Sequence, residues 1–188
     1  MQWSNLNNIT SKQYLCGFCH NKVATNKGYF VESGNQAQIY ICSHCFQPTF
    51  FKDGKQIPGV SPGNPILHLP TQIEELYEEA RRCISISSFT AAVLILRKLL
   101  MNISVNQGAE EGKSFLFYVN YLADAGYVPP NGKQWVDHIR KKGNEATHEI
   151  KLMSNEDALD LIVFTEMLLK FIYEFPNKIP NSDITQKL

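Results

Sequence analysis

The sequence predicts a mostly α-helical protein in which a small N-terminal β unit precedes an antiparallel helical bundle. Three observations predict this order. Two Cys-x-x-Cys pairs lie within the first 45 residues, a stretch rich in proline and glycine follows, and apolar residues then recur at helical spacing. We therefore expect a β unit at residues 1–57, a connector at 58–70 and a helical unit at 71–188 that ends in a short polar tail.

The composition is that of a globular protein and argues against several classes. Of the 188 residues, 44% are hydrophobic and 19% are charged, as in a soluble folded chain. No apolar run approaches the roughly 18 residues of a membrane span, and the N-terminus lacks the pattern of a signal peptide. We therefore expect a cytoplasmic protein that does not enter a membrane.

The formal net charge is zero, but it divides unevenly along the chain. Residues 1–57 carry five lysines against two acids, whereas residues 71–188 carry 13 cations against 16 acids. Neither segment is basic enough to hold nucleic acid by bulk charge, so any such contact has to be local.

The two cysteine pairs predict a structural zinc site. They consist of Cys16, Cys19, Cys42 and Cys45. A two-residue spacer lets both thiolates of a pair reach one ion, and two pairs complete a tetrahedral Zn²⁺ site that has no open position for water. Two alternatives remain, a redox role for the pairs and replacement of one thiol by the neighbouring His20 or His44.

The residues around the cysteine pairs predict the strands of a zinc ribbon. Residues 29–32 and 38–41 read as two strands joined by a turn at 33–35, and residues 50–57 read as a hairpin turning at Asp53-Gly54. The first thirteen residues predict no element. A unit this short cannot bury a large core, so we expect the metal to supply much of its folding energy.

The connector and the first helices follow from local signals. Four prolines and two glycines at 58–70 exclude helix and sheet ladder, and we expect Ile66, Leu67 and Leu69 to pack along the next unit. Thr71 and Glu74 read as a capping box that starts a helix, whose charged residues, Arg81 among them, read as a solvated face.

Four further helices complete the expected bundle. The second begins at Ser88 and is apolar enough to be central; the third spans about 113–125, a fourth covers 135–148, and the last starts at a Ser154 cap and fades near Pro176. Short connections favour an antiparallel arrangement. Cys83, alone on the first helix, reads as a small core residue.

The fourth helix concentrates the polar groups of the helical unit. If it is helical, Arg140, Asn144 and His148 stack along one face, where a guanidinium, an amide and an imidazole can hold a phosphate. Lys141 and Lys142 add positive charge. On the second helix, Arg97 either extends to the surface or reaches this polar face. Trp135, Val136, Ile139 and Ala146 can seat the opposite side of the fourth helix in the core.

Several segments of the helical unit resemble one bacterial family. These are Ala91-Ala-Val-Leu-Ile-Leu-Arg-Lys-Leu-Leu-Met, Gly112-Lys-Ser-Phe, Gly126-Tyr-Val-Pro-Pro and Trp135-Val-Asp-His-Ile-Arg-Lys-Lys-Gly-Asn-Glu-Ala-Thr-His-Glu. Together they resemble the family called domain of unknown function 4145, over roughly residues 71–175, and members with an N-terminal zinc ribbon are part of that resemblance. That family is similar to the HEPN superfamily of all-helical domains, many of them ribonucleases or nucleotide-binding partners in toxin, restriction and phage-defence systems.

The resemblance implies a HEPN-like bundle, a homodimer and a motif to be tested residue by residue. The HEPN ribonuclease pattern is an Arg, usually followed by Asn or another polar residue, and then a His. With Asn144 and His148 in their places, the Arg position is occupied by Gly143. Arg140 lies nearly one turn earlier and is the available substitute. In such an enzyme the His would transfer protons and the Arg would stabilise a charged phosphorane.

Three functional hypotheses follow. In the first, the chain is a binding module that holds a nucleotide, RNA or DNA through phosphate contacts, and the ribbon adds Lys22, Lys27 and either Tyr29 or Phe30. The phosphate-binding residues would be Arg97, Arg140, Lys141, Lys142, Asn144 and His148.

The second hypothesis is a metal-independent HEPN-type ribonuclease in which His148, Arg140 and Asn144 are catalytic. The third is a non-catalytic adaptor that binds a protein partner, with Asn144 and His148 forming a buried hydrogen-bonded pair at a helix kink.

Overall fold

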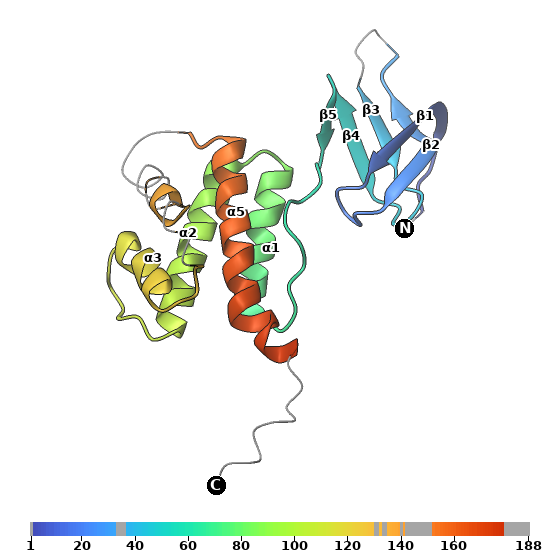
Figure 1. Cartoon of the computed structure of the whole chain (residues 1–188). Coiled ribbons are helices and arrows are strands. Elements are labelled where there is room, and N and C mark those ends of the chain that lie inside the picture. Colours follow the sequence, from blue (N-terminus) through green and yellow to red (C-terminus); the bar gives the residue numbers. More distant parts are fainter. Residues whose placement is uncertain are drawn as a thin grey trace. The chain divides into compact units, whose positions relative to one another are not determined.

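The computed structural model describes residues 2–32, 37–129, 132, 135–139, 141 and 152–178. The chain divides into two compact units, Met1–Ser61 and Pro62–Leu188 (Figure 1). Each unit has its own cluster of buried hydrophobic residues. The division falls inside the proline- and glycine-rich stretch.

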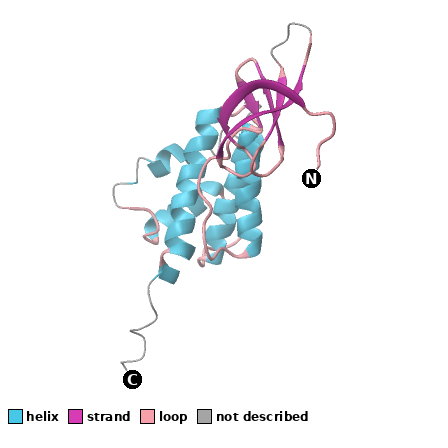
Figure 2. Cartoon of the chain, turned by 90° about the vertical axis from the view of Figure 1, so that its right-hand side faces the viewer, coloured by secondary structure: helices cyan, strands magenta, loops and turns pink. Residues whose placement is uncertain are grey.

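The N-terminal unit is a five-stranded antiparallel sheet whose strand order is the chain order. Figure 2 shows its strands in magenta. Its strands are β1 (Asn7–Leu15), β2 (Lys22–Phe30), β3 (Gln38–Ile41), β4 (Pro48–Lys52) and β5 (Lys55–Ile57). Its core is small and consists of Tyr14, Cys16, Val23, Tyr40, Cys42 and Phe51.

Strand β1 corrects the expectation that the first thirteen residues form no element. It is largely exposed and polar, so it lacks the hydrophobic alternation that predicts a strand. Pairing with β2 supplies its backbone hydrogen bonds, with a shift of register between Asn8 and Lys12. The structure also starts β2 at Lys22, well before the predicted strand at residue 29.

The predicted hairpin at the end of the sheet is confirmed. Lys52 pairs with Lys55 across the turn, and the two turn residues, Asp53 and Gly54, have φ angles of 51° and 76°. Positive φ at both central positions is the geometry of a type I′ turn, which Asp-Gly favours. The other predicted turn, at 33–35, lies outside the described residues.

The helical unit contains α1 (Thr71–Ser85), α2 (Phe89–Asn106), α3 (Phe115–Asp124) and α5 (Asn155–Leu169). Residues 135–139 are helical as well. Beyond α5 the chain continues as a π-helix, Lys170–Glu174, and a 3₁₀ turn, Pro176–Lys178. As predicted, α2 is central, because it contacts α1, α3 and α5.

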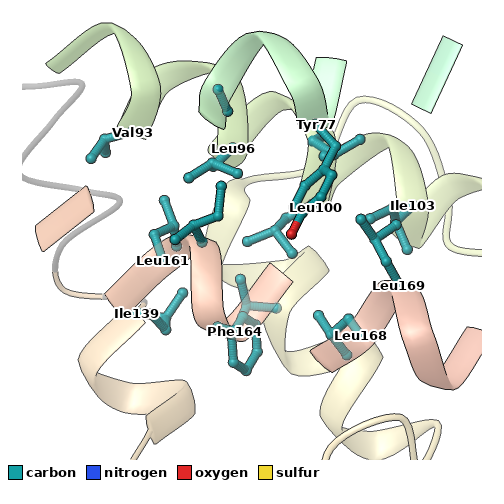
Figure 3. Packing of buried hydrophobic residues seen from close by; sticks show 14 of the residues in the cluster. Tyr77, Val93, Leu96, Leu100, Ile103, Ile139, Leu161, Phe164, Leu168 and Leu169 are labelled. Carbon is teal, nitrogen blue, oxygen red and sulfur yellow. The ribbon is translucent and has the colours of Figure 1, made fainter. Parts of the chain in front are cut away.

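The buried apolar residues of the helical unit form one continuous cluster. Leu96, Leu99, Leu100 and Ile103 of α2 are completely buried, and Figure 3 shows Leu96 and Leu100 among side chains of α1 and α5. By length and composition alone α2 could cross a membrane, contrary to the expectation that no segment reaches that length. Its burial in this core is the arrangement of a central helix in a globular domain.

Two of the predicted helix starts are confirmed, and the cap predicted for a third is wrong. Ser154 forms a reciprocal capping box with Asp157, and α2 begins directly after Ser88. At α1 the predicted capping box is wrong: the cap is Pro70, and no side-chain oxygen caps the helix. The carbonyl of Pro70 instead accepts hydrogen bonds from the amides of Ile73 and Glu74.

The segment 62–70 packs on the helical unit, and Arg81 holds it there. Arg81 is only 2% exposed, so its assignment to a solvated face is wrong. Its guanidinium donates hydrogen bonds to the carbonyl oxygens of Pro62 and Gly63 at 2.8 and 2.9 Å. Buried cations need such partners. Ile66 enters the core as expected, whereas Leu67 is 58% exposed.

Candidate metal centre

The four cysteines predicted as metal ligands converge at one point in the N-terminal unit. Their sulfur atoms all lie within 4.8 Å of one another. The Sγ atoms of Cys16 and Cys45 are 3.7 Å apart, and those of Cys19 and Cys42 are 3.8 Å apart. Four sulfurs at about 2.3 Å from a tetrahedral ion are separated by about 3.8 Å, so the cluster has the dimensions of a zinc–thiolate site.

The sulfur distances describe four reduced thiols gathered around one point. All four thiols are free, and a disulfide requires sulfur atoms about 2.05 Å apart. Each of the two short distances joins one cysteine pair to the other, as expected of residues that share an ion. Cys16 and Cys42 are buried, whereas Cys19 and Cys45 are partly exposed.

The two cysteine pairs sit on backbone turns of the same construction. In the first, the amide of His20 donates to the carbonyl of Cys16 at 2.9 Å; in the second, the amide of Phe46 donates to the carbonyl of Cys42 at 3.1 Å. Both donors have a positive φ, of 56° and 60°. This repeated conformation aims both thiols of a pair at the same point.

Backbone amides also donate to the sulfur of the first cysteine in each pair. The Sγ of Cys16 accepts from the amide of Phe18 at 3.5 Å, and the Sγ of Cys42 accepts from the amide of His44 at 3.4 Å. Hydrogen bonds to sulfur stabilise thiolates without adding a positive charge. The turns are therefore suited to hold negatively charged sulfur.

Neither adjacent histidine joins the cluster. Among the described residues, the group of close metal-binding atoms contains the four cysteines alone. The ring of His44 instead contacts the amide nitrogen of Asn21, with Nδ1 at 3.1 Å. The alternative in which His20 or His44 replaces a thiol is therefore not supported by this geometry.

Gly17 is required by close packing of the first turn. A Cβ atom at this position would lie 2.4 Å from the carbonyl oxygen of Gly59 and 2.5 Å from that of Pro58. Any larger residue would push the turn away from residues 58–59 and displace Cys16. Part of the cluster's geometry is therefore set by residues that follow the sheet in the sequence.

The environment of the cluster separates the acidities of its thiols. Burial, reinforced by the neighbouring cysteines, raises the pKa of Cys45 to about 12. Although burial opposes the change, hydrogen bonds from Asn21 and the other thiols lower the pKa of Cys19 to about 6. Four neighbouring thiols cannot all ionise without a cation, so a bound metal is what would make this set fully thiolate.

The predicted phosphate site lies largely outside the described residues. Arg140, Lys142, Gly143, Asn144 and His148 all belong to the part of the chain that is not described. Of the predicted set, the structure places Lys141, which is helical and exposed, and Arg97. The stacking of Arg140, Asn144 and His148 therefore remains a prediction.

The buried side of the same helix is confirmed where it is described. Val136 and Ile139 are buried, and the ring of Trp135 meets that of Phe164 edge to face with centroids 5.1 Å apart. This side anchors residues 135–139 on α5. The opposite side of a helix anchored in this way faces solvent. Asp137, which lies within residues 135–139, is exposed.

Arg97 has a partner that the sequence did not predict. Its guanidinium carbon lies 4.4 Å from the centre of the Phe115 ring on α3. Burial lowers the pKa of Arg97 from its ordinary value, and the aromatic face offsets part of the cost of removing the cation from water. The predicted alternative, in which Arg97 reaches the polar face of the fourth helix, involves residues outside the described ones.

Comparison with known protein families identifies the family of the helical unit. The sequence model described as domain of unknown function DUF4145 matches residues 78–187. This chain belongs to the DUF4145 family. No curated protein and no solved structure matches the chain. The matched segment begins inside α1, so the four-cysteine cluster lies wholly outside the part that defines DUF4145 membership.

Sequence reasoning missed one polar pair within the DUF4145 segment. The Nε2 atom of His138 lies 2.9 Å from a carboxylate oxygen of Asp160 on α5, and both side chains are about 40% exposed, at 43% and 40%. The two residues are 22 positions apart, and no local pattern connects them. The pair ties the short helical segment to α5 at the surface.

Proposed function

We propose that this DUF4145 protein is a nucleic-acid- or nucleotide-binding module whose N-terminal unit is a zinc ribbon. The four-cysteine cluster is the observation that supports this proposal most directly. Zinc is the proposed ion because four thiolates in a tetrahedron suit it and leave no open position for catalysis. The zinc is structural and stabilises a sheet with an excess of lysines over acids.

The helical unit is proposed to be a HEPN-like bundle that contributes a second phosphate contact through Arg140, Asn144 and His148. The support is the sequence of the fourth helix together with its anchored side, Trp135 and Ile139. The protein is proposed to act in the cytoplasm, where the reducing environment keeps such thiols free for metal.

The metal assignment is tested by elemental analysis of protein purified without chelators. We expect one zinc per chain in the wild type, and loss of zinc when Cys16, Cys19, Cys42 or Cys45 is replaced by serine. Replacement of Cys83, which lies in the helical unit, is the matched control and should leave the zinc content unchanged. Iron in place of zinc, or full zinc content in a variant such as Cys42→Ser, would contradict the assignment.

The binding function is tested with mixed RNA and DNA oligonucleotides, following gel shift and cleavage in the same samples. We expect a shift without cleavage that is weakened in Arg140→Ala. Cleavage by the wild type that is lost in folded His148→Ala would instead establish a HEPN-type ribonuclease. Neither a shift nor cleavage would favour the adaptor that binds a protein partner.

A homodimer is proposed as the assembled form. Val163 on α5, Phe171 on its π-helical extension and Phe175 directly after that extension are 52%, 45% and 41% exposed. Apolar side chains repeated along one helix can form a symmetric interface with a second copy. Light scattering at several concentrations should give twice the chain mass, and Phe171→Glu should reduce it to the mass of one chain.

A further inference from the structure

Four apolar side chains form a continuous row across the sheet. Tyr29 on β2 pairs directly with Ile39 on β3, Ile39 pairs with Phe50 on β4, and Phe50 pairs with Ile57 on β5. Directly paired residues project from the same face of a sheet. The row therefore crosses β2 to β5, the strands labelled in Figure 1. We call it the apolar row.

The apolar row lies on the face of the sheet opposite its core. Tyr40 and Phe51, adjacent in sequence to Ile39 and Phe50, are buried in the core of the unit, and successive residues of a strand point to opposite faces. Ile57 is 46% exposed. A hollow of about 110 Å³ is lined by residues that include Tyr29, Ile39 and Phe50.

Two lysines stand beside the apolar row. Lys52 follows Phe50 by two residues and Lys55 precedes Ile57 by two, so both project from the same face as the row. They pair directly with each other across the hairpin. Like charges in this position destabilise a sheet, and among the described residues neither ammonium group has a carboxylate within ion-pair distance.

The first aromatic of the row is held in a fixed orientation. The ring of Trp3 meets that of Tyr29 at 60°, with centroids 6.3 Å apart, and the Trp3 indole donates a hydrogen bond to the carbonyl of Phe46 at 2.7 Å. The hydroxyl of Tyr29 donates to the carbonyl of Ser4. These contacts reduce the side-chain freedom that a ligand would otherwise have to remove.

We infer that the apolar row, with Lys52 and Lys55, is a binding surface for single-stranded nucleic acid. Bases stack on Tyr29 and Phe50, and the phosphate backbone passes the two ammonium groups, where it relieves their repulsion. This inference rests on the proposed nucleic-acid-binding function and gives it a location and a substrate class.

The chemistry of the surface distinguishes its occupant from two others. A duplex keeps its bases stacked inside and presents phosphates and groove edges, so it would leave an apolar row unused. An apolar protein segment would cover the row but would gain nothing from two facing lysines. The unit carries five lysines and only two acids, which complements a polyanion.

The surface differs from the ribbon contacts expected from the sequence. Lys27 is engaged by the side-chain oxygen of Asn8 at 2.7 Å, and Lys22 pairs with Leu15 at the other end of β2, next to the first cysteine turn. Tyr29 is retained. Phe50, Lys52 and Lys55, which the sequence had assigned only to a hairpin, become the principal contacts.

The test measures binding of the full-length, zinc-loaded protein to fluorescein-labelled oligo(dT) and oligo(U) about 12 nucleotides long, with a blunt duplex of equal length beside them. We expect tighter binding of both single strands than of the duplex. Phe50→Ala should weaken single-strand binding by about 5- to 140-fold, the effect of losing one stacked base. Phe18→Ala, which removes an exposed aromatic from the first cysteine turn, is the matched control and should bind as the wild type does.

The lysines are tested through the salt dependence of binding, which requires no substitution of an apolar residue. Replacing Lys52 and Lys55 together by glutamine should reduce the slope of log affinity against log salt by about 1.4, since each single-strand phosphate contact contributes about 0.7. Lys12→Gln is the control, because the Lys12 ammonium lies 4.7 Å from the centre of the Phe51 ring on the core side of the sheet; it should leave the slope unchanged. Zinc content and melting temperature, measured on each variant, confirm that the sheet is intact.

The outcomes separate this inference from the function on which it rests. If the wild type binds no oligonucleotide, the proposed function fails and the inference fails with it. If the wild type binds but Phe50→Ala and the lysine pair variant bind equally well, the inference is overturned while binding through the helical unit stands. Self-association that is lost in Phe50→Ala, with oligonucleotide binding unchanged, would also overturn it and make a second copy the occupant.

Discussion

The two units of this chain reach stability by different means. The helical unit buries a large apolar cluster in which six side chains of α2 alone are completely enclosed, whereas the buried cluster of the sheet unit has six residues, of which two are cysteines. A small domain buries too little apolar surface to offset the loss of chain entropy. We therefore expect the four-cysteine cluster, through its proposed zinc, to supply stability that the small core of the N-terminal unit lacks.

The largest effect is expected when the four-cysteine cluster is disrupted. We expect Cys42→Ser to unfold the N-terminal unit, because structural zinc contributes about 10–16 kcal/mol of apparent binding free energy in small domains. The helical unit should keep its helices and its own cooperative transition. Two-dimensional NMR would show loss of dispersed strand resonances alone. Survival of the strand resonances in the zinc-free variant would mean that the small core suffices.

The converse experiment weakens the large core. Leu100 is fully buried on α2, so Leu100→Ala should destabilise the helical unit by about 2–5 kcal/mol through lost contacts and the cavity that remains. Denaturant unfolding followed by circular dichroism measures this loss, and zinc content should not change. Leu94→Ala on the same helix is the control, because Leu94 is 43% exposed; an equal loss in both variants would contradict the proposed role of burial.

A smaller effect is expected where the helical unit uses a polar contact in place of apolar burial. Arg81→Met keeps much of the side-chain volume but leaves the carbonyls of Pro62 and Gly63 without their donor. We expect a loss of about 1–3 kcal/mol in the free energy of unfolding. Arg82→Met, at the exposed neighbouring position, should be nearly neutral. The two variants are compared by thermal unfolding.

The smallest expected effect depends on pH. Although burial opposes ionisation, hydrogen bonds from Lys170 and Asn64 lower the pKa of Glu166 from its ordinary value of 4.5. A lowered pKa in the folded state means that the ionised carboxylate adds stability above about pH 4.5, and that this stability is lost as the pH falls through the folded-state pKa.

Glu166→Gln should therefore cost about 1 kcal/mol near pH 7 and less near pH 3. Unfolding free energies of wild type and variant at the two pH values measure this difference. Glu156→Gln, at an exposed position in the first turn of α5, is the control. A cost that did not shrink on acidification would mean that packing, and not charge, is what Glu166 contributes.

Local rules predicted the parts of both units that depend on neighbouring residues. The spacing within each cysteine pair is fixed by a few bonds, and the Asp53-Gly54 turn depends on the backbone freedom of two residues. The position of Ser154 at the start of α5 is similarly local. These features could be read from the sequence because little of the remaining fold is needed to produce them.

Features that join distant segments could not be predicted in the same way. The burial of Arg81 depends on carbonyl groups of the connector, and the contact of His138 with Asp160 depends on how two helices pack. The apolar row depends on the register of three strand pairs, which no single segment determines. Strand β1 was missed because its stability comes from its partner and not from its own pattern.

The way Arg81 holds the connector sets the minimum fragment in which the helical unit can be studied or transferred. The family match begins at residue 78, yet Ile66 belongs to the same core and Asn64 donates from its amide and side chain to Glu166. A fragment cut at the family boundary would expose the place of Ile66 and remove the two backbone carbonyls that accept from Arg81. The shortest fragment that keeps these contacts therefore starts near Pro62. Any fusion or domain exchange in this protein should be joined before that residue.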